Sequence, residues 1–202
     1  MKKNVLITTL VLSAIFMLIY SCYDETEKTQ LSAKRDTLST DSLVRLGGYL
    51  TTIIGCNDCH TPKKMLDNGM MVLDSALLLS GYPSSRGLPK FPDQPVEAGF
   101  VVGNLDATST YGPWGTSFAA NLTSDDTGIG KWSLSQFSIA LQHGQYRGIK
   151  GTRMLQPTMP WPNFKHMSAI DVKAIYEYLK STKPVVNIVP AFKPAKKHGD
   201  EI

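Results

Sequence analysis

Apolar residues recur with a helical period in the first part of the folded chain. Leu43, Leu46, Leu50 and Ile53 fall at i, i+3, i+7 and i+10, which places them on one face of a helix. Gly55 follows directly and is a typical helix stop. The pattern therefore predicts an amphipathic helix that ends at about residue 55.

Two further helices are predicted by their start signals. Ser133 and Gln136 form a capping-box pattern ahead of an apolar run, and Ser168 with Asp171 forms a weaker one. Pro184 limits how far the last of these helices can extend. The sequence thus predicts one helix at the start of the domain, one in the middle and one at the end.

The segment between the first two helices has a different character. Residues 61–120 carry six prolines among several glycines, a composition that disfavours helix and favours loops. Residues 100–105 and 117–122 have a weak strand pattern, so a short hairpin is expected there. We therefore expect a long loop or a short β-hairpin insertion.

The first 21 residues have the pattern of an export signal. Lys2 and Lys3 precede an apolar run that is shorter than the ~20 residues of a membrane-spanning helix. The run ends at Ser21 and Cys22, which resembles a bacterial lipobox whose cysteine is acylated. We expect a lipoprotein-type signal peptide over residues 1–21 and a lipid on Cys22. An uncleaved signal anchor, or a plain secretory signal with an incidental cysteine, remains open.

The rest of the chain divides by composition. Residues 22–40 are polar with no apolar period, so we expect a flexible tether. Residues 41–185 hold the predicted helices and form the expected domain. Residues 186–202 contain prolines and lysines and are expected to form a surface tail.

Composition and charge exclude several classes of protein. The 202 residues are 42% hydrophobic and 19% charged, which suits a globular domain and excludes a disordered or collagen-like chain. The net charge is only +4, and two of the positive charges lie in the expected signal peptide. No concentrated basic face is indicated, so nucleic acid is not an expected partner.

The chemistry of the chain is concentrated at residues 56–60, which read Cys-Asn-Asp-Cys-His. One helical turn places Cys56 and Cys59 on the same edge, where their thiols can add to the two vinyl groups of haem. His60 follows directly and can bind the iron. This C-x-x-C-H pattern is specific because it combines covalent attachment and an axial ligand in one turn.

Two other uses of the cysteine pair are weaker. A zinc site would need more ligands of this kind, but the chain has only three cysteines, and no second pair. A thioredoxin-like redox pair would need a parallel β-α-β pattern, which is not visible around residues 56–60. If Cys22 carries a lipid and Cys56 and Cys59 carry haem, no cysteine is left for a disulfide.

The sixth iron ligand is expected to be Met159. Pro157, Pro160 and Pro162 surround it and hold the backbone extended, so the strap can aim one side chain with little loss of freedom. Met154 is the second candidate and His143 the third, and an ordinary packing role for Met159 stays open. Other methionines and histidines are weaker candidates: Met65, Met70, Met71, His166, Met167 and His198.

From about residue 41 to 185 the chain resembles the class I cytochrome c family. The resemblance rests on a helix leading into Cys56–His60, on the proline-flanked Met159, and on a final helix over residues 171–179. It is closest to bacterial membrane-associated monohaem domains, which share sequences such as Gly-Pro-Trp-Gly at 112–115 and Met-Pro-Trp at 159–161.

The resemblance implies an all-α, cytochrome c-like fold around one covalent haem c. It also implies that the first and last helices cross closely, with Gly47 or Gly48 making room for Tyr176 or Tyr178. On the sequence alone, glycines in mid-helix cost about 1 kcal/mol each relative to alanine, so a packing reason is expected.

By this resemblance the protein is an electron carrier and not an enzyme, with iron held by His60 and Met159. Its lipid would hold it on a membrane of the bacterial cell envelope, facing the periplasm. Its redox partners would be a dehydrogenase, other cytochromes or a terminal oxidase. A peroxidase-like haem enzyme and a haem-based gas sensor, both with a labile sixth ligand, are the alternatives.

Overall fold

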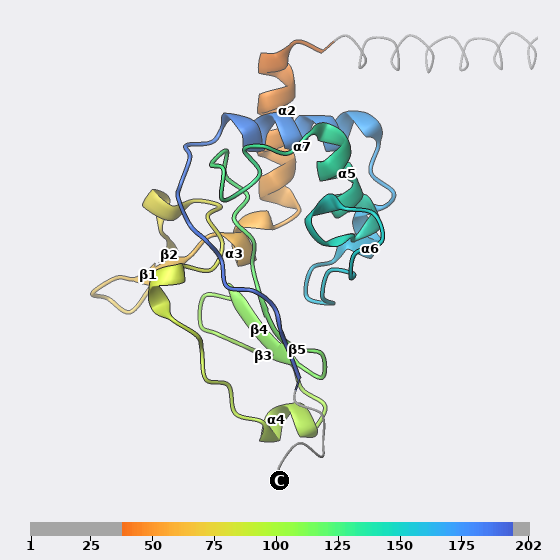
Figure 1. Cartoon of the computed structure of the whole chain (residues 1–202). Coiled ribbons are helices and arrows are strands. Elements are labelled where there is room, and N and C mark those ends of the chain that lie inside the picture. The colour runs from red at the N-terminus through yellow and green to blue at the C-terminus, as the bar shows by residue number, and fades with distance from the viewer. Residues whose placement is uncertain (1–37, 196–202) are drawn as a thin grey trace, which may run out of the picture. The chain divides into compact units, whose positions relative to one another are not determined.

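Helix α2, Thr40–Ile53, and helix α7, Ala169–Ser181, pack directly against each other (Figure 1). The computed structural model describes residues 38–195, so the expected signal peptide, Cys22 and nearly all of the tether lie outside the described residues. Gly47 faces the backbone of Ala174, and a Cβ at Gly47 would collide with that carbonyl and with Cβ of Tyr178. The two helices can approach this closely because position 47 has no side chain.

The main hydrophobic core lies beneath these helices. Helix α5, Leu134–His143, contributes Phe137 and Leu141, and the short helix α6, Trp161–Phe164, contributes Phe164. The other buried members come from α7 and from two loops: Leu79, Ile129, Val172, Ile175 and Leu179. Burying such side chains is worth about 1.5–3 kcal/mol each, so this cluster is the main source of stability.

The predicted helix starts are confirmed. Oγ of Ser133 accepts a hydrogen bond from the Gln136 N–H at 3.1 Å at the start of α5. Oγ of Ser168 accepts one from the Asp171 N–H at 3.2 Å at the start of α7. Each cap satisfies a backbone donor that the helix cannot satisfy internally. All three predicted helices are therefore present.

The expectation of an all-α fold is wrong. Within residues 38–195, helix makes up 37% and strand 13%, so the domain is mixed α and β. One sheet pairs β1, Lys63–Met65, with β2, Met71–Leu73; the other has the order β3-β4-β5-β6 and is antiparallel throughout. The prolines and glycines of residues 61–120 prevent helix, and the backbone there satisfies part of its hydrogen bonding in short ladders instead.

The larger sheet only partly matches the expected hairpin. Its strands are Val102–Gly103 (β3), Ser109–Gly112 (β4), Gly115–Phe118 (β5) and Lys193–Pro194 (β6). The segments expected to pair with each other do contain β3 and β5, but β4 lies between those strands. The short turn between β4 and β5 makes that pair the real hairpin.

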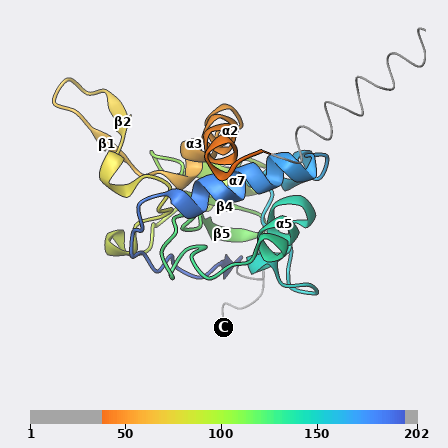
Figure 2. The ribbon, with the colours of Figure 1, turned by 90° about the horizontal axis from the view of Figure 1, so that it is seen from above.

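Several short elements connect these parts. They are the motif helix α3 (Cys56–His60), the 3-10 turns η1 (Ser75–Leu77), η2 (Ser84–Arg86) and η3 (Tyr146–Gly148), and the helix α4 (Gln94–Glu97). Seen from above, α3 lies beside α2, while α5 lies on the other side of α7 (Figure 2). Within the described residues, no helix is long and apolar enough to cross a membrane.

The chain beyond α7 packs back onto the domain. The side chain of Asn187 is 7% exposed, and its Nδ2 donates to the carbonyls of Ser80 and Tyr82 at 2.7 and 2.9 Å. Its Oδ1 accepts from the Ser84 N–H at 2.9 Å. Residues 187–194 thus tie the loop at 80–84 to the edge of the larger sheet.

The contact at Gly47 gives a testable prediction. Gly47→Ala should lower the free energy of unfolding by about 2 kcal/mol, because the steric cost of overpacking exceeds the gain in helix propensity. Gly48→Ala is the matched control, since its Cβ would meet only the Tyr178 ring at 3.1 Å and the ring can move. Urea unfolding of both variants measures the difference; equal stability would show that the close crossing is not needed.

Candidate functional site

The C-x-x-C-H motif forms a helical turn of its own. Gly55, at φ 76°, separates α2 from α3, and its carbonyl accepts from the Asp58 N–H at 3.0 Å. Cys56 and Cys59 are three residues apart on α3, both half-buried and not bridged to each other. Cys56 also packs against the hydrophobic core. The two thiols therefore lie at a protein surface that adjoins the core, as attachment to a largely buried apolar group requires.

The environment keeps both thiols protonated. Burial raises the pKa of the Cys56 thiol to about 11, and the neighbouring Asp58 adds to the rise. Burial also raises the pKa of Cys59, although Lys63 opposes it. Redox-active cysteine pairs need a thiolate and hence a lowered pKa. The local electrostatics therefore weigh against a thioredoxin-like use of this pair.

The imidazole of His60 is oriented by a backbone carbonyl. Its Nδ1 lies 2.8 Å from the carbonyl oxygen of Ala120, so Nδ1–H donates and Nε2 is left as the nitrogen that can bind a metal. Burial lowers the pKa of His60, and the bond to Ala120 opposes this only in part. A neutral, oriented imidazole is the form that ligates iron.

The loop at 79–82 bonds to the chain on both sides of the contact between His60 and Ala120. The Gly81 N–H donates to the carbonyl of His60 at 2.8 Å, and the Tyr82 N–H donates to that of Ala119 at 3.0 Å. Gly81 has φ 76°, and a Cβ there would lie 2.6 Å from the Ala120 oxygen. The loop at 79–82 thus fits between the histidine and its acceptor.

Sequence reasoning missed both of these positioning residues. A backbone carbonyl can come from any residue type, so Ala120 carries no signal in the sequence. Gly81 was visible only as one of many glycines in residues 61–120.

Met159 lies on a strap beside the same core. Its side chain is half-buried and packs against the hydrophobic cluster that Cys56 also contacts. The Met159 N–H donates to the carbonyl of Gln156 at 2.9 Å, and its own carbonyl accepts from the Trp161 N–H at 2.8 Å. Oγ1 of Thr158 lies 3.2 Å from Oγ1 of Thr110 on β4. Turns on both sides and a contact to the sheet thus fix the strap.

The alternative ligands are less well placed. Met154 is 40% exposed, and its sulfur accepts a hydrogen bond from Nε2 of Gln145 at 3.1 Å. His143 is exposed at the end of α5, and His166 is exposed ahead of α7. Met167 is half-buried against the core and is the strongest remaining competitor. His198 lies outside the described residues.

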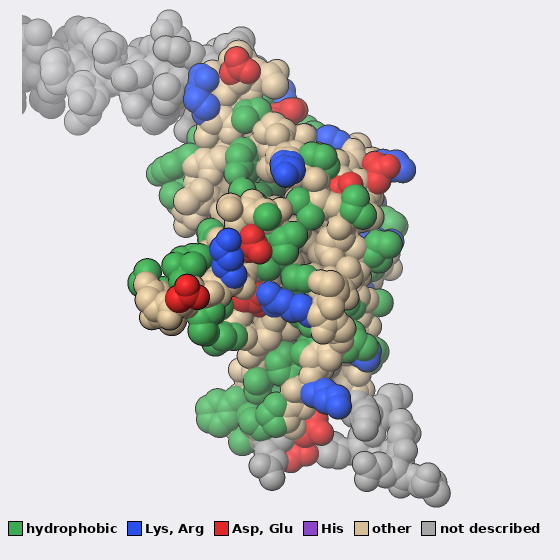
Figure 3. Space-filling view, turned by 90° about the vertical axis from the view of Figure 1, so that its left-hand side faces the viewer, with side chains coloured by type: hydrophobic (Ala, Val, Ile, Leu, Met, Phe, Trp, Pro, Cys, Tyr) green, Lys and Arg blue, Asp and Glu red, His purple; other side chains and the backbone are tan. Residues whose placement is uncertain are grey.

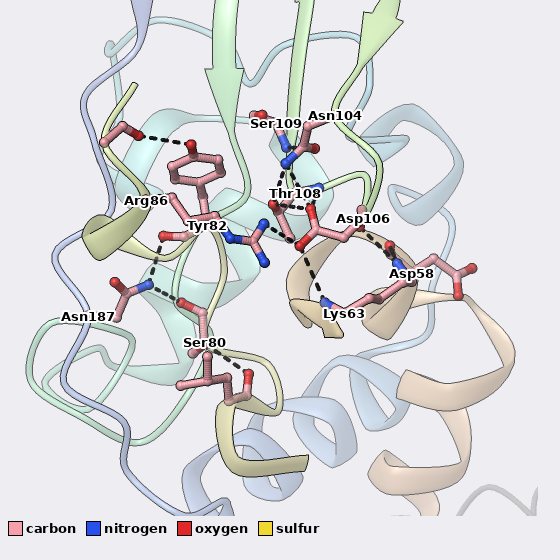
Figure 4. A network of polar contacts seen from close by, with 12 residues as sticks. Asp58, Lys63, Ser80, Tyr82, Arg86, Asn104, Asp106, Thr108, Ser109 and Asn187 are labelled. Atoms are coloured by element: carbon pink, nitrogen blue, oxygen red, sulfur yellow. Dashed lines mark hydrogen bonds and ion pairs between the residues drawn. The ribbon is translucent and has the colours of Figure 1, made fainter. Parts of the chain in front are cut away.

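A buried carboxylate secures the chain that leaves the motif (Figure 4). Asp106 is 3% exposed and accepts hydrogen bonds from the Arg86 guanidinium at 2.5 Å and from Oγ1 of Thr108 at 2.6 Å. Nζ of Lys63 donates to the carbonyls of Asp106 and Asp58 at 2.8 and 2.6 Å. This network connects α3 to two loops that the sequence places far away.

The same hydrogen bonds determine the protonation of Asp106. Burial alone would raise the pKa of this carboxyl. The hydrogen bonds from Thr108, from Arg86 and from the Lys63 N–H outweigh burial and lower the pKa below its ordinary value.

Two further observations bear on the group that this site could hold. Among residues 38–195, no cluster of three or more His, Cys, Asp or Glu side chains could hold a metal ion. Cys56 and Cys59 therefore have no further side chains near them that would complete a zinc site in this part of the chain. Nε1 of Trp114 is buried and has no hydrogen-bond partner within the described chain. A bound group with acceptor oxygens, such as the propionates of haem, would satisfy this donor.

Relatives of known role match most of the chain. It is 39% identical over 157 residues to the cytochrome c subunit of a quinone alcohol dehydrogenase from Gluconacetobacter polyoxogenes. It is 31% identical over 148 residues to the gluconate 2-dehydrogenase cytochrome c subunit of Pantoea cypripedii, and 31% identical over 163 residues to the fructose dehydrogenase cytochrome subunit of Gluconobacter japonicus. These matches cover 76%, 73% and 79% of this chain.

The chain belongs to the class I c-type cytochromes. The cofactor of this family is haem c, and cytochrome subunits of this kind function in electron transfer. The chain spans about a quarter of the length of these relatives, which are 24–25% covered. No family model matches it.

The fit of Gly81 against Ala120 gives one prediction for this cytochrome. Gly81→Ala should reduce the free energy of unfolding by about 1–3 kcal/mol through strain and collision. It should also raise the midpoint potential, because an imidazole that loses its acceptor becomes a less basic ligand. Gly99→Ala is the control: it has φ 90° but open space around it. Equal potentials in the two variants would contradict the positioning role.

The network at Asp106 gives a second prediction. A carboxyl with a lowered pKa in the folded state stabilises the protein above its unfolded pKa of about 4, and this contribution is lost as the pH falls through the folded value. Asp106→Asn should therefore cost about 2 kcal/mol at pH 7 and flatten the fall in stability below pH 4. Asp126 forms an exposed pair with Lys131, so Asp126→Asn should change neither the stability at pH 7 nor its fall below pH 4. Unfolding curves across this pH range provide the test.

Proposed function

We propose that this protein is a lipid-anchored electron carrier with one haem c per chain. In this proposal Cys56 and Cys59 hold the haem covalently, and His60 and Met159 are the axial ligands. The observation that carries the proposal is the hydrogen bond from Nδ1 of His60 to Ala120, because it leaves Nε2 as the nitrogen that can bind iron, directly after the two unbridged cysteines.

The bound iron would supply a one-electron change between its ferric and ferrous states. The chain would contribute His60 and Met159 as ligands to the iron and keep its surroundings apolar. A thioether ligand from Met159 favours the ferrous state over bis-histidine ligation, and burial disfavours the extra charge of the ferric state. Trp114, whose indole N–H has no partner in the described chain, is a suitable donor to a propionate.

The fixed position of Met159 also argues against the two alternative functions. A peroxidase-like enzyme and a gas sensor both need a labile sixth position. The strap that carries Met159 is held by backbone hydrogen bonds on both sides and by Thr158 against Thr110, which favours a permanent ligand. Electron transfer therefore remains the proposed function of the whole protein.

We further propose that the protein is exported and works at a membrane. The support is the sequence alone: the apolar run after Lys2 and Lys3, and Cys22 at its end. Acylation of Cys22 followed by a tether to residue 40 would hold the domain on the periplasmic side of the bacterial envelope. Confinement at a membrane raises the effective concentration beside membrane-bound redox partners.

The proposed electron donor is a dehydrogenase. The matched relatives are named as cytochrome subunits of dehydrogenases for gluconate, fructose and alcohol. Other cytochromes or a terminal oxidase would accept the electron. Nucleic acid is not proposed as a partner.

Covalent haem attachment is tested by substituting the two cysteines. The Cys56→Ser, Cys59→Ser double variant should lose all haem to acid-acetone extraction, whereas the unchanged protein should retain one haem per chain. Haem content and the pyridine haemochrome spectrum measure both quantities. Haem that resists extraction from the double variant would disprove attachment through these residues.

The sixth ligand is tested by Met159→Ala. This variant should become high-spin, bind carbon monoxide in the ferrous state and have a lower midpoint potential, because the thioether no longer stabilises Fe(II). Met154→Ala and Met167→Ala are the controls and should keep the low-spin spectrum. If Met167→Ala alone opened the iron, the ligand would be Met167.

A further inference from the structure

The hairpin formed by β1, β2 and their turn carries three apolar side chains and one lysine, Lys63 or Lys64, on each face. Met65 pairs across the ladder with Met71, and Lys63 pairs with Leu73. Side chains alternate along a strand, so Met65, Met71 and Leu73 share one face, and Leu66, Met70 and Val72 share the other.

Nothing in the described chain forms a third layer on this hairpin. Its sheet contains β1 and β2 only, and it projects from the domain in two perpendicular views (Figures 1 and 2). Met65 is 61% exposed, Met70 57%, Leu73 41% and Leu66 39%. Figure 3 looks at this side of the molecule and shows hydrophobic side chains gathered on the projection. A two-stranded hairpin of this kind is barely stable without something packed on it.

The base of the hairpin is fixed to the haem motif. β1 begins three residues after His60, and the Lys63 side chain bonds to the carbonyls of Asp58 and Asp106. On the other strand, the Asp74 N–H donates to the carbonyl of Pro62 at 2.8 Å. A partner that binds the hairpin would therefore be held beside the turn that carries Cys59 and His60.

We propose that this hairpin, residues 63–73, inserts into an apolar cleft of the dehydrogenase subunit that reduces the haem. The inference rests on the proposed function and adds the surface and the kind of partner. Interfaces within permanent complexes are more hydrophobic than transient ones, and the matched relatives are named as subunits. Methionine-rich surfaces suit such docking because their side chains adapt to the opposing shape.

The chemistry of the hairpin favours a protein cleft over a lipid surface. Its tip is Asp67-Asn68-Gly69, all exposed. Insertion into a bilayer would bury this carboxylate in hydrocarbon at high cost, whereas a protein cleft can leave the tip in water or pair it with a donor. Residues 63–73 carry two lysines and one aspartate, a net charge of only +1, and Nζ of Lys63 is held by the carbonyls of Asp58 and Asp106, so the attraction for anionic headgroups is weak. Because the hairpin has apolar side chains on two faces, a cleft with two walls covers it more fully than one flat surface does.

The test uses the full chain, with haem, in the cells that produce it. Membranes from these cells are supplied with gluconate, fructose or ethanol, and the rate of haem reduction is followed by absorbance. Met65→Ser with Met70→Ser removes one exposed apolar side chain from each face. Ile149→Ser is the matched control: Ile149 is 52% exposed and follows η3, next to α5, which lies away from the hairpin.

The double variant should be reduced at least about 10-fold more slowly than the unchanged protein, as expected for loss of central interface side chains. The control should be reduced at the normal rate, and all three proteins should take up electrons equally fast from dithionite. The rate should change less than about twofold between 50 and 300 mM salt, because an apolar contact is not screened.

A photoreactive amino acid at position 65 identifies what the hairpin touches. A cross-link to the dehydrogenase subunit, absent when the probe is at position 149, supports the proposal. A cross-link only to lipid or to a second copy of this chain overturns it. An unchanged rate in the double variant overturns the hairpin proposal alone, whereas failure of every dehydrogenase substrate to reduce the unchanged protein overturns the proposed function with it.

Discussion

The hydrogen bond between Nδ1 of His60 and the carbonyl of Ala120 is the contact on which the arrangement of this cytochrome domain depends. It joins two points that are 60 residues apart in the chain. The intervening segment must leave the motif and return, and on the way the loop at 79–82 bonds to both ends. Glycine is required at position 81, where these three chain segments meet, because a side chain there would displace the carbonyl of Ala120.

The long segment between the motif and α5 is organised by polar contacts more than by an apolar core. Its buried residues include Thr61, Ser80, Asp106, Thr108 and Asn121, each of which has hydrogen-bond partners. Leu79, Tyr82 and Ile129 provide the apolar contacts to the helical part. Buried polar networks of this kind specify one arrangement, since any shift leaves a donor or acceptor unpaired. The segment can therefore hold a carbonyl at a fixed place without a helix.

The helical part and the inserted segment of the domain therefore have different roles. The helices α5, α6 and α7, with two loop residues, supply the apolar core, against which α2, Cys56 and Met159 pack. The inserted segment orients His60 from one side and carries the β1–β2 hairpin outward from the same turn. The proposed haem site and the β1–β2 hairpin are thus joined through a few residues, Asp58 to Lys63, that Asp106 holds in place.

The sequence by itself determined the helices, the motif and the family. The caps at Ser133 and Ser168 and the C-x-x-C-H turn are local signals, read from neighbouring residues, and the structure contains each of them. The close crossing of the first and last helices was expected from the family resemblance, at Gly47 or Gly48, and the structure has the closest approach at Gly47. The all-α expectation failed because strands in a proline-rich segment are made by pairing with distant partners, such as β5 with β6. Only the tertiary structure decided that Ala120 orients His60 and that Asp106 anchors the base of the hairpin. Contacts through backbone carbonyls and between distant loops leave no periodicity or motif in the chain, so their geometry exists only once the fold has formed.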